Sequence, residues 1–270
     1  MRELALIWAG ALVLMVALWL VQRRRQDASL VDAGWSGGIG LGGLTLLALG
    51  SGDPLRRGVF AVMVACWSGR LTAYLVRDRL IGKPEDGRYA MLRSSWGAQA
   101  QRNFFWFFQA QALLVAIFTV PAWVVANAPG AFARWFDIAG LALWVVGSVI
   151  EAVADRELAR WRKNPASHGR TCRSGLWRYS RHPNYFGEWL LWCGFALVGA
   201  GSPWFAAAAA VPLLLLGLLL WVTGIPYTER RALVSRGDDY RRYQRATSAF
   251  IPWIPRAEDP APDQANRAPT

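Results

Sequence analysis

The segment from Gly175 to Glu188 joins basic and aromatic residues to the start of an apolar stretch. It also places the carboxylate of Glu188 one turn inside the apolar part. Charged side chains are costly beside lipid, and where they persist they commonly mark a binding site. We therefore expect this segment to bind a polar ligand at the edge of a hydrophobic helix.

Pro183 indicates where that helix begins, because proline suits the first turn of a helix, in which its missing N–H costs nothing. We predict a helix that starts near His182. Its free N–H groups and the positive end of its dipole would then lie beside Arg178, Arg181 and His182, a combination that favours phosphate binding. The plainer interpretation is a local salt-bridge network that only anchors the loop.

Two pairs of polar residues four apart could bind the uncharged part of such a ligand. Asn184 and Glu188 share one helical face and could hold an amide or ribose hydroxyls. Glu151 and Asp155 also share a face, where like charges repel each other unless a cation or a hydroxyl-rich ligand bonds them. Asp155 alone would also fit a solvated helix end.

Arg70, Tyr74 and Arg77 share one face of another predicted helix. Arg70 lies roughly 10 Å deeper than Arg77 at the rise of an α-helix, and an ionisable group at depth usually marks a site. Its side chain could instead extend to the membrane interface. Asp32 either caps its helix or reaches the same cavity as Arg70.

The pattern Gly38-Ile-Gly-Leu-Gly-Gly43 formally matches a dinucleotide-binding motif. That motif needs a preceding strand and a following helix in a βαβ unit. Here the glycines lie within an apolar stretch. We therefore expect them to allow close packing between membrane helices.

The composition points to a membrane protein. The chain has 270 residues, of which 54% are hydrophobic, and a mean hydropathy of +0.20. Its apolar residues form seven stretches, each close to the roughly 20 residues that span a bilayer. These stretches cover Leu4–Val21, Leu30–Leu49, Val59–Val76, Phe104–Val125, Phe136–Ala154, Tyr185–Ala200 and Trp204–Ile225. We predict an all-α fold, a polytopic membrane helical bundle of about seven transmembrane helices.

The positive charges indicate an orientation. The net charge is +12, and most of the 30 Lys and Arg fall within residues 23–25, 77–102, 156–181 and 230–267. These segments lie on one side of a seven-span topology, so the positive-inside pattern predicts an N-terminus outside and a cytosolic C-terminus. Charge that reports orientation argues against a nucleic-acid partner. We expect a multi-pass protein of the bacterial inner membrane and leave the oligomeric state open.

We expect residues 1–255 to form one membrane-embedded domain, with a cofactor half at about 136–255. The first span is too long for a cleavable signal peptide, and its basic cluster follows it. The tail over 256–270 is rich in Pro and Ala, which is typical of disorder. Three cysteines outside any Cys-x-x-Cys pair predict neither a disulfide framework nor a zinc site.

Several of these motifs resemble a known family. Glu151-Ala-Val-Ala-Asp155, the segment Gly175–Glu188 and the closing Asp239-Tyr240 and Phe250-Ile-Pro252 are similar to DUF1295 membrane proteins. That resemblance covers about residues 30 to 255. From Glu151 onward the chain also resembles the C-terminal domain of steroid 5-alpha reductases. The resemblance implies a membrane oxidoreductase that takes NADPH from the cytosol. Its substrate would be a lipid-like steroid, isoprenoid or other enone, reduced at a C=C bond conjugated to a carbonyl.

The same resemblance implies site residues. The expected cofactor-binding residues are Glu151, Asp155, Arg178, Tyr179, Arg181, His182, Asn184, Tyr185, Glu188 and Tyr240. Among them the motif match itself implies Asp155, Tyr179, Asn184, Glu188 and Tyr240. Arg178, Arg181 and His182 come from the phosphate argument, and Glu151 stands where several steroid reductases have Asn. Tyr74 and Arg70 are the expected catalytic residues, from geometry alone, because a buried phenol near Arg70 could give a proton to an enolate oxygen in that reaction. No metal is expected.

Two other functions fit the same residues. Isoprenylcysteine carboxyl methyltransferases carry a similar Arg-His-Pro-x-Tyr-x-Gly motif and bind S-adenosylmethionine on the cytosolic side, so a membrane methyltransferase is one alternative. A non-catalytic membrane scaffold or transporter is the other. Transporters often contain inverted repeats, and we find no internal repeat at a fixed period.

Overall fold

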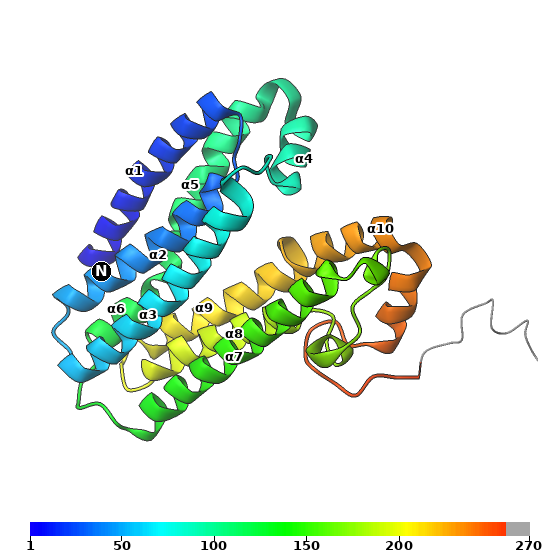
Figure 1. Cartoon of the computed structure of the whole chain (residues 1–270). Helices are drawn as coiled ribbons and strands as arrows, with labels where there is room; N and C mark the ends of the chain where they lie inside the picture. Colours follow the sequence, from blue (N-terminus) through cyan, green and yellow to red (C-terminus); the bar gives the residue numbers. More distant parts are fainter. Residues whose placement is uncertain (258–270) are drawn as a thin grey trace, which may run out of the picture. The chain divides into compact units, whose positions relative to one another are not determined.

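The computed structural model of the protein describes residues 1–257, and within them it has helices joined by loops and no strand. This confirms the predicted all-α fold. The α-helices, shown in Figure 1, are α1 (Arg2–Arg25), α2 (Leu30–Leu49), α3 (Pro54–Leu75), α4 (Gly87–Trp96), α5 (Ala100–Phe118), α6 (Val120–Ala126), α7 (Trp135–Lys163), α8 (Pro183–Val198), α9 (Phe205–Gly217) and α10 (Ile225–Ala246). Short π-helical and 3₁₀ turns are η1 (Val76–Leu80), η2 (Gly97–Gln99), η3 (Pro165–Ser167), η4 (Gly175–Arg178) and η5 (Leu218–Val222).

Several of these helices are long and apolar enough to cross a membrane, which identifies a multi-pass membrane protein by length and composition. They are the five stretches Arg2–Arg25, Pro54–Leu80, Gly87–Ala126, Trp135–Lys163 and Phe205–Ala246. The predicted second and sixth spans, Leu30–Leu49 and Tyr185–Ala200, are not among these five stretches. Glycines lower the hydropathy of α2, and α8 has only 16 residues. The count of seven spans and the orientation of the termini stay predictions.

The described chain forms two compact units. The first contains residues 1–139 and 195–211, and the second contains residues 140–194 and the chain from Pro212. The helices α7, α8 and α9 contribute residues to both. The single membrane domain over 1–255 and its cofactor half at 136–255 stay predictions. Apart from Arg256 and Ala257, the predicted disordered tail over 256–270 lies outside the described residues.

In the first unit, glycines of α2 allow its neighbours to approach closely. A Cβ atom added at Gly40 would lie 2.1 Å from Oγ of Ser68 on α3, and one at Gly42 would lie 2.9 Å from a methyl carbon of Ile7 on α1. Ser68 donates a hydrogen bond to the carbonyl of Ser36 at 2.9 Å. The expectation that this glycine pattern serves helix packing is confirmed.

A buried ion pair fastens α3 to the start of α7. Nε of Arg56 donates to Oδ1 of Asp137 at 2.8 Å, and both side chains are essentially inaccessible, at 1% and 0% exposed. The same guanidinium donates to the carbonyls of Gly130 and Ala131, each at 2.9 Å. All three nitrogens of the buried Arg56 guanidinium therefore have hydrogen-bond acceptors, and such pairing offsets the cost of burying a charge.

Asp32 does not cap α2, so that interpretation is wrong. The N-cap residue is Ser29, and Asp32 lies inside the first turn. Its carboxylate accepts hydrogen bonds from Arg79 at 2.9 Å, from Arg88 at 2.6 Å and from the Tyr89 hydroxyl at 2.5 Å. The cationic donors from η1 and α4 outcompete the local backbone N–H groups that a capping residue would bind.

In the second unit, glycines bring the backbones of α7 and α8 into direct contact. A Cβ at Gly187 would lie 2.7 Å from the carbonyl oxygen of Gly147 and 2.7 Å from the amide nitrogen of Glu151. Gly194, seven residues later on the same face, approaches the amide of Trp144 in the same way. This glycine seam sets the middle turns of α7 beside α8 along most of its length.

Candidate functional site

The glycine seam brings the predicted carboxylates of α7 beside the predicted polar residues of α8. Nδ2 of Asn184 donates to Oδ1 of Asp155 at 3.1 Å. One turn further in, buried Glu151 touches Gly187 through its backbone and Cβ. Oε1 of Glu188 accepts from the indole N–H of Trp192 at 2.9 Å. The two pairs expected from the sequence thus lie on adjoining helices, as a polar row beside an apolar core.

The helix α8 begins at Pro183, as predicted. The turn before it is held by Ser180, whose Oγ accepts from the amide of His182 at 3.1 Å and donates to the carbonyl of Phe250 at 2.8 Å. The 3₁₀ turn η4 precedes this turn. It begins at Gly175, where φ is +60° and a Cβ would meet the Glu157 carboxylate, so only glycine fits there.

Arg181 is engaged inside the unit. Its Nε donates to Oε1 of Glu229 at 2.6 Å, and its Nη1 donates to the carbonyls of Gln244 at 2.9 Å and Thr247 at 2.7 Å. These contacts tie the loop before α8 to α10. The expected binding of a phosphate by Arg181 stays a prediction, and it would compete with these three acceptors.

Glu229 is the centre of a cluster that sequence reasoning did not assign a role. Beyond Arg181 it accepts from Gln244 at 2.8 Å, contacts Nε2 of His182 at 3.3 Å and accepts from the Tyr240 hydroxyl at 3.4 Å. The only sequence signal was a carboxylate close behind the last apolar stretch. The cluster gathers three of the predicted cofactor residues, Arg181, His182 and Tyr240, around one carboxylate.

His182 is buried, and its ring stacks on Tyr185 with centroids 5.3 Å apart. Burial lowers the pKa of His182 below its usual value, while the hydrogen bond with Glu229 opposes this and the charge of Arg181 adds to it. The imidazole is therefore neutral at neutral pH. A neutral ring packed on a tyrosine orients the loop and does not supply a charge for a ligand.

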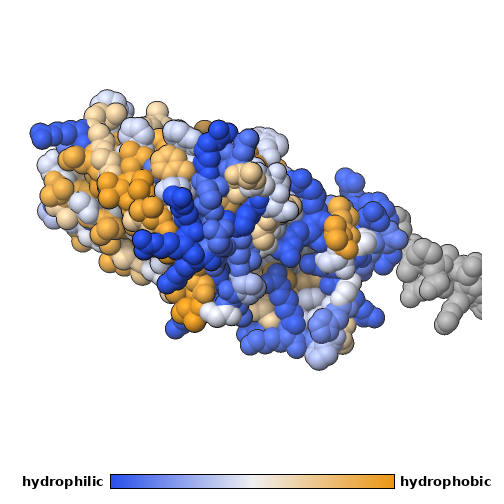
Figure 2. All heavy atoms as spheres, turned by 90° about the horizontal axis from the view of Figure 1, so that it is seen from above, coloured by the Kyte–Doolittle hydropathy of each residue, from blue (hydrophilic) through white to orange (hydrophobic). Residues whose placement is uncertain are grey.

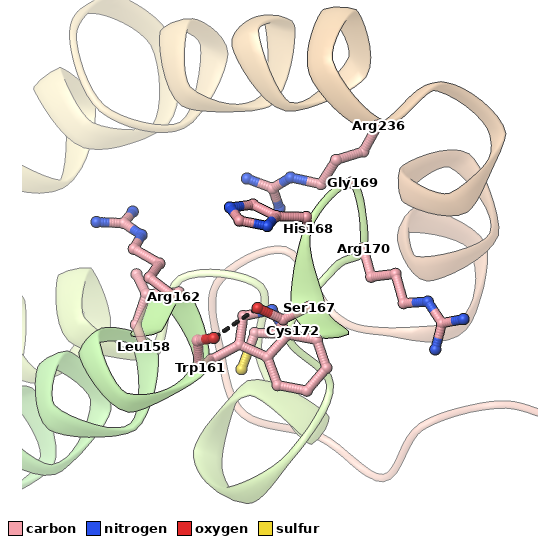
Figure 3. A pocket seen from close by; sticks show the side chains of 9 residues that line it. All are labelled: Leu158, Trp161, Arg162, Ser167, His168, Gly169, Arg170, Cys172 and Arg236. Carbon is pink, nitrogen blue, oxygen red and sulfur yellow. Dashed lines mark hydrogen bonds between the residues drawn. The ribbon is translucent and has the colours of Figure 1, made fainter. Parts of the chain in front are cut away.

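A pocket of about 270 Å³ lies at the end of α7 (Figure 3). Its wall combines Trp161 and Arg162 of α7, the loop residues His168 and Arg170, and Arg236 of α10. In Figure 3 the guanidinium of Arg236 extends from α10 toward His168, whereas the side chain of Arg170 turns away from it. Within residues 1–257, no carboxylate forms an ion pair with any of these three arginines. The pocket therefore offers uncompensated positive charge to an anion.

The loop that forms this pocket is fastened to α10 through Asp239. The amide of Thr171 donates to Oδ2 of Asp239 at 2.8 Å, and Arg173 binds Oδ1 at 3.0 Å. Just before Asp239, α10 kinks at Gly237, where φ is +51°. The kink brings Arg236 and Asp239 to the same loop.

The pocket arginines were not among the predicted site residues. From the sequence they counted only as positive-inside charge. The density of basic residues between Arg156 and Arg181 was the available signal.

Arg178, Arg70 and Tyr74 are the remaining predicted residues. Arg178 is exposed, with its guanidinium 6.0 Å from the ring centre of Tyr179, which is 42% exposed. Arg70 and Tyr74 lie in the first unit on exposed positions of α3, and Tyr74 is 48% exposed. The phenol is thus half-exposed rather than buried, and the catalytic roles expected for Arg70 and Tyr74 stay predictions.

Comparison with known proteins gives the family. Residues 18–247 match the family described as "Protein of unknown function (DUF1295)". This match covers most of the chain, so the protein belongs to the DUF1295 family. The resemblance drawn from the motifs is confirmed.

Curated relatives show a partial likeness to steroid-metabolising enzymes. A 3-oxo-5-alpha-steroid 4-dehydrogenase 1 of Mus musculus is 45% identical over 60 residues, 22% of this chain and 24% of the relative. A steroid 5-alpha-reductase of Gossypium hirsutum is 31% identical over 122 residues, 43% of each chain. An uncharacterized protein of Schizosaccharomyces pombe is 28% identical over 209 residues, 68% of this chain and 60% of the relative. The chain thus spans about a quarter of the mouse enzyme it matches.

Proposed function

We propose that this DUF1295 protein is an NADPH-dependent membrane reductase that acts on a C=C bond conjugated to a carbonyl in a lipid-like substrate. The membrane location follows from its helices. The reaction class is supported by the partial likeness to enzymes named as a 3-oxo-5-alpha-steroid 4-dehydrogenase and a steroid 5-alpha-reductase. The bacterial inner membrane is the proposed location, on the asymmetry of its positive charges.

The basic pocket is the observation that carries the choice of cofactor. Arg162 and Arg236 present guanidinium groups without ion-pair partners among the described residues, and His168 lies between the elements that carry them. NADPH carries three phosphate groups, and arginine binds phosphate with charge-assisted, bidentate geometry. S-adenosylmethionine has no phosphate and carries a positive sulfonium. The pocket therefore favours NADPH over the methyl donor.

The polar row between α7 and α8 suits the uncharged parts of the same cofactor. Asp155 and Asn184 offer carboxylate and amide groups held by one hydrogen bond, and Glu151 and Glu188 add carboxylates one turn deeper. Carboxylates accept hydrogen bonds from ribose hydroxyls, and an asparagine both donates and accepts. The residues present thus fit a ligand with one anionic end and one hydroxyl- and amide-bearing end.

When bound, NADPH would supply a hydride to the β-carbon of the conjugated bond. The residues of this chain have the complementary tasks. We assign to Tyr74 the hydrogen bond and proton for the carbonyl oxygen, where negative charge collects, and the resulting enol would tautomerise to the saturated carbonyl compound. Arg70, one turn away on the same helix, would offer its positive charge to the oxygen on which the negative charge develops. The apolar helices would dissolve the substrate and keep the site poor in water.

A binding titration on the detergent-purified protein tests this proposal. NADPH, NADH and S-adenosylmethionine are added separately, and binding is followed by isothermal titration calorimetry. We expect NADPH to bind, and S-adenosylmethionine to give no heat. Binding of S-adenosylmethionine without NADPH would establish the methyltransferase alternative. Absence of binding by all three would point to the non-catalytic alternative, and each of these two results overturns the reductase.

A second measurement tests the reaction itself. Purified protein in lipid nanodiscs is incubated with NADPH and a panel of enones that contains a 3-oxo-4-ene steroid and an isoprenoid enone. The decrease of absorbance at the nicotinamide band gives turnover, and mass spectrometry of the product identifies the reduced bond. A product that gains two hydrogens at the conjugated C=C bond supports the proposal, and reduction at the carbonyl alone contradicts it.

A further inference from the structure

The segment that follows α10 exposes large apolar side chains. Ile251, Trp253 and Ile254 are 60%, 71% and 80% exposed, although the same stretch contains Phe250, which is only 7% exposed. Exposed aliphatic and aromatic residues grouped in a short segment mark an interaction surface. These exposed apolar side chains differ from those of the preceding helix α10, whose surface is largely hydrophilic (Figure 2).

This segment is held in place by its backbone. The carbonyl of Phe250 accepts from Ser180, the amide of Trp253 donates to the carbonyl of Tyr179 at 2.9 Å, and the amide of Arg256 donates to the carbonyl of Ala246 at 2.8 Å. Pro252 and Pro255 further restrict its backbone. We call residues Phe250–Arg256 the strap. Because its backbone is held in place, its apolar side chains are already exposed in a fixed arrangement, and binding a partner would cost little conformational entropy.

The position of the strap along α8 indicates what it faces. The ring of Phe250 packs on Phe186 and Trp189, with centroids 5.7 and 5.8 Å apart. Both residues lie in the first turns of the apolar helix α8, which begins at Pro183. The strap is therefore level with the polar end of a hydrophobic helix, which is the depth at which tryptophan is enriched in membrane proteins.

The charges beside the strap suit one kind of surface. Arg256 at its end, Arg178 beside Tyr179 and Arg245 in the last turn of α10 are all exposed. Basic residues next to exposed tryptophan and isoleucine favour a layer of anionic lipid headgroups above acyl chains. A soluble acidic protein would match the charges but would leave the apolar group facing water.

We propose that residues Ile251–Arg256 form a membrane-surface anchor that inserts Ile251, Trp253 and Ile254 into the headgroup region of an anionic lipid leaflet. Through the hydrogen bond between Trp253 and Tyr179, this anchor fixes the loop that precedes α8 relative to the membrane. The inference does not depend on the proposed reductase function, since it rests on exposure, backbone contacts and charge alone.

Fluorescent labels at single cysteines test the anchor. Cys66, Cys172 and Cys193 are replaced by alanine, and Trp253→Cys or Ile254→Cys is labelled with an environment-sensitive nitrobenzoxadiazole dye in lipid nanodiscs. Both side chains are exposed, and the backbone N–H that binds Tyr179 survives either change, so folding should be kept. Ser235→Cys on α10, also exposed, is the matched control.

We expect the labels at 253 and 254 to emit at shorter wavelength than the label at 235. They should also resist aqueous iodide and be quenched by spin-labelled lipid, most strongly by spin labels about 5–10 Å deep, at the boundary between headgroups and acyl chains. Quenching should increase when phosphatidylglycerol replaces part of the phosphatidylcholine, and Arg256→Glu should reduce that increase. Labels quenched by iodide as efficiently as at 235 would overturn the anchor. A blue-shifted label that spin-labelled lipid does not quench would instead indicate a protein partner and would equally overturn it.

Discussion

Asn184 donates a hydrogen bond to the carboxylate of Asp155 at 3.1 Å, across the contact between α8 and α7. The bond is possible because Gly187 and Gly147 let the two backbones touch just beyond it. Small residues are the usual means of close approach between membrane helices. The polar row and the helix packing therefore depend on the same seam.

Gly187→Ala should separate α7 from α8. The new methyl group would lie 2.7 Å from the carbonyl oxygen of Gly147, which is backbone and cannot rotate away. We expect a loss of about 1–3 kcal/mol in stability, as for other overpacked cores, with weaker NADPH binding. Thermal unfolding and ligand titration measure both effects.

Gly69→Ala is the matched control for that change, because a Cβ at Gly69 meets nothing within 4 Å. Alanine is the better helix former, so this variant should keep or slightly raise stability. Equal melting temperatures for Gly187→Ala and the wild type would show that the seam tolerates an extra methyl group and would contradict the packing argument.

The fold could be predicted from local patterns, whereas much of the site depends on distant contacts. Pro183 predicts the start of α8, and the spacing of four residues between Glu151 and Asp155 predicts that both lie on one face of α7. The partner of Arg181 could not be read from the sequence, because Glu229 lies 48 residues away. Without that partner, Arg181 looked like a free cation beside a helix end.

The pocket arginines were missed for the same physical reason. Arg162 and Arg236 come from different helices, and only the kink at Gly237 and the contacts of Asp239 bring them to one loop. In the sequence, the basic residues around Arg162 and Arg236 indicate only the orientation of the chain in the membrane. A charge count along the chain does not distinguish arginines that converge on a pocket from arginines that face water.

Arg56→Ala should destabilise the first unit strongly. It leaves the carboxylate of Asp137, 0% exposed, without its guanidinium partner. Removing one member of a buried ion pair typically costs about 3–5 kcal/mol. Thermal unfolding in detergent should show the loss, and Asp137→Ala should show a similar one.

The double variant Arg56→Met, Asp137→Leu tests whether that loss comes from the orphaned charge. Apolar replacement of a complete buried pair is often neutral or stabilising, so the double variant should recover much of the stability lost in the single variants. Losses that simply add would mean that the two side chains act independently, against the structure.

Acid should weaken the loop before α8 through His182. Burial places the pKa of folded His182 below the value near 6.5 of the unfolded chain. As the pH falls, the unfolded state therefore takes up this proton first. The stability that comes from the neutral ring is complete above about pH 6.5 and decreases as the pH falls below it.

Melting temperatures between pH 8 and pH 5, compared with those of His182→Gln, measure this contribution. Glutamine can still donate to Glu229 but does not titrate, so its melting temperature should fall less over this range than that of the wild type. Carboxylates elsewhere titrate in both proteins and cancel in the comparison. Identical slopes would show that His182 does not titrate differently on folding.

Arg236→Ala and Arg162→Ala should each weaken NADPH binding, if the pocket holds phosphate groups. We expect about a tenfold higher Kd for each, which corresponds to about 1.4 kcal/mol. The wild-type affinity should also fall with added salt, and less steeply in the variants, because fewer charge contacts remain. Calorimetric titration at two salt concentrations gives both quantities.

Arg241→Ala is the control for these variants. Arg241 lies on α10 with its side chain 58% exposed and paired with Asp238 at 2.7 Å, and it does not line the pocket. Its removal lowers the net charge by the same amount as the pocket variants do. A Kd that rises equally in all three variants would mean that only the overall charge attracts the cofactor.

Tyr74→Phe should abolish most of the turnover while leaving NADPH binding unchanged. No cofactor contact is assigned to Tyr74, so the loss of its hydroxyl removes none of the proposed contacts with NADPH. A positioned proton donor commonly contributes a factor of about 100 or more to the rate, and kcat should fall by that much on the enone that the wild type reduces. Tyr227→Phe, on α10, is the control and should keep its activity. If Tyr74→Phe retains kcat, the proton must come from another donor, and the reductase proposal would survive with α3 serving only to bind substrate.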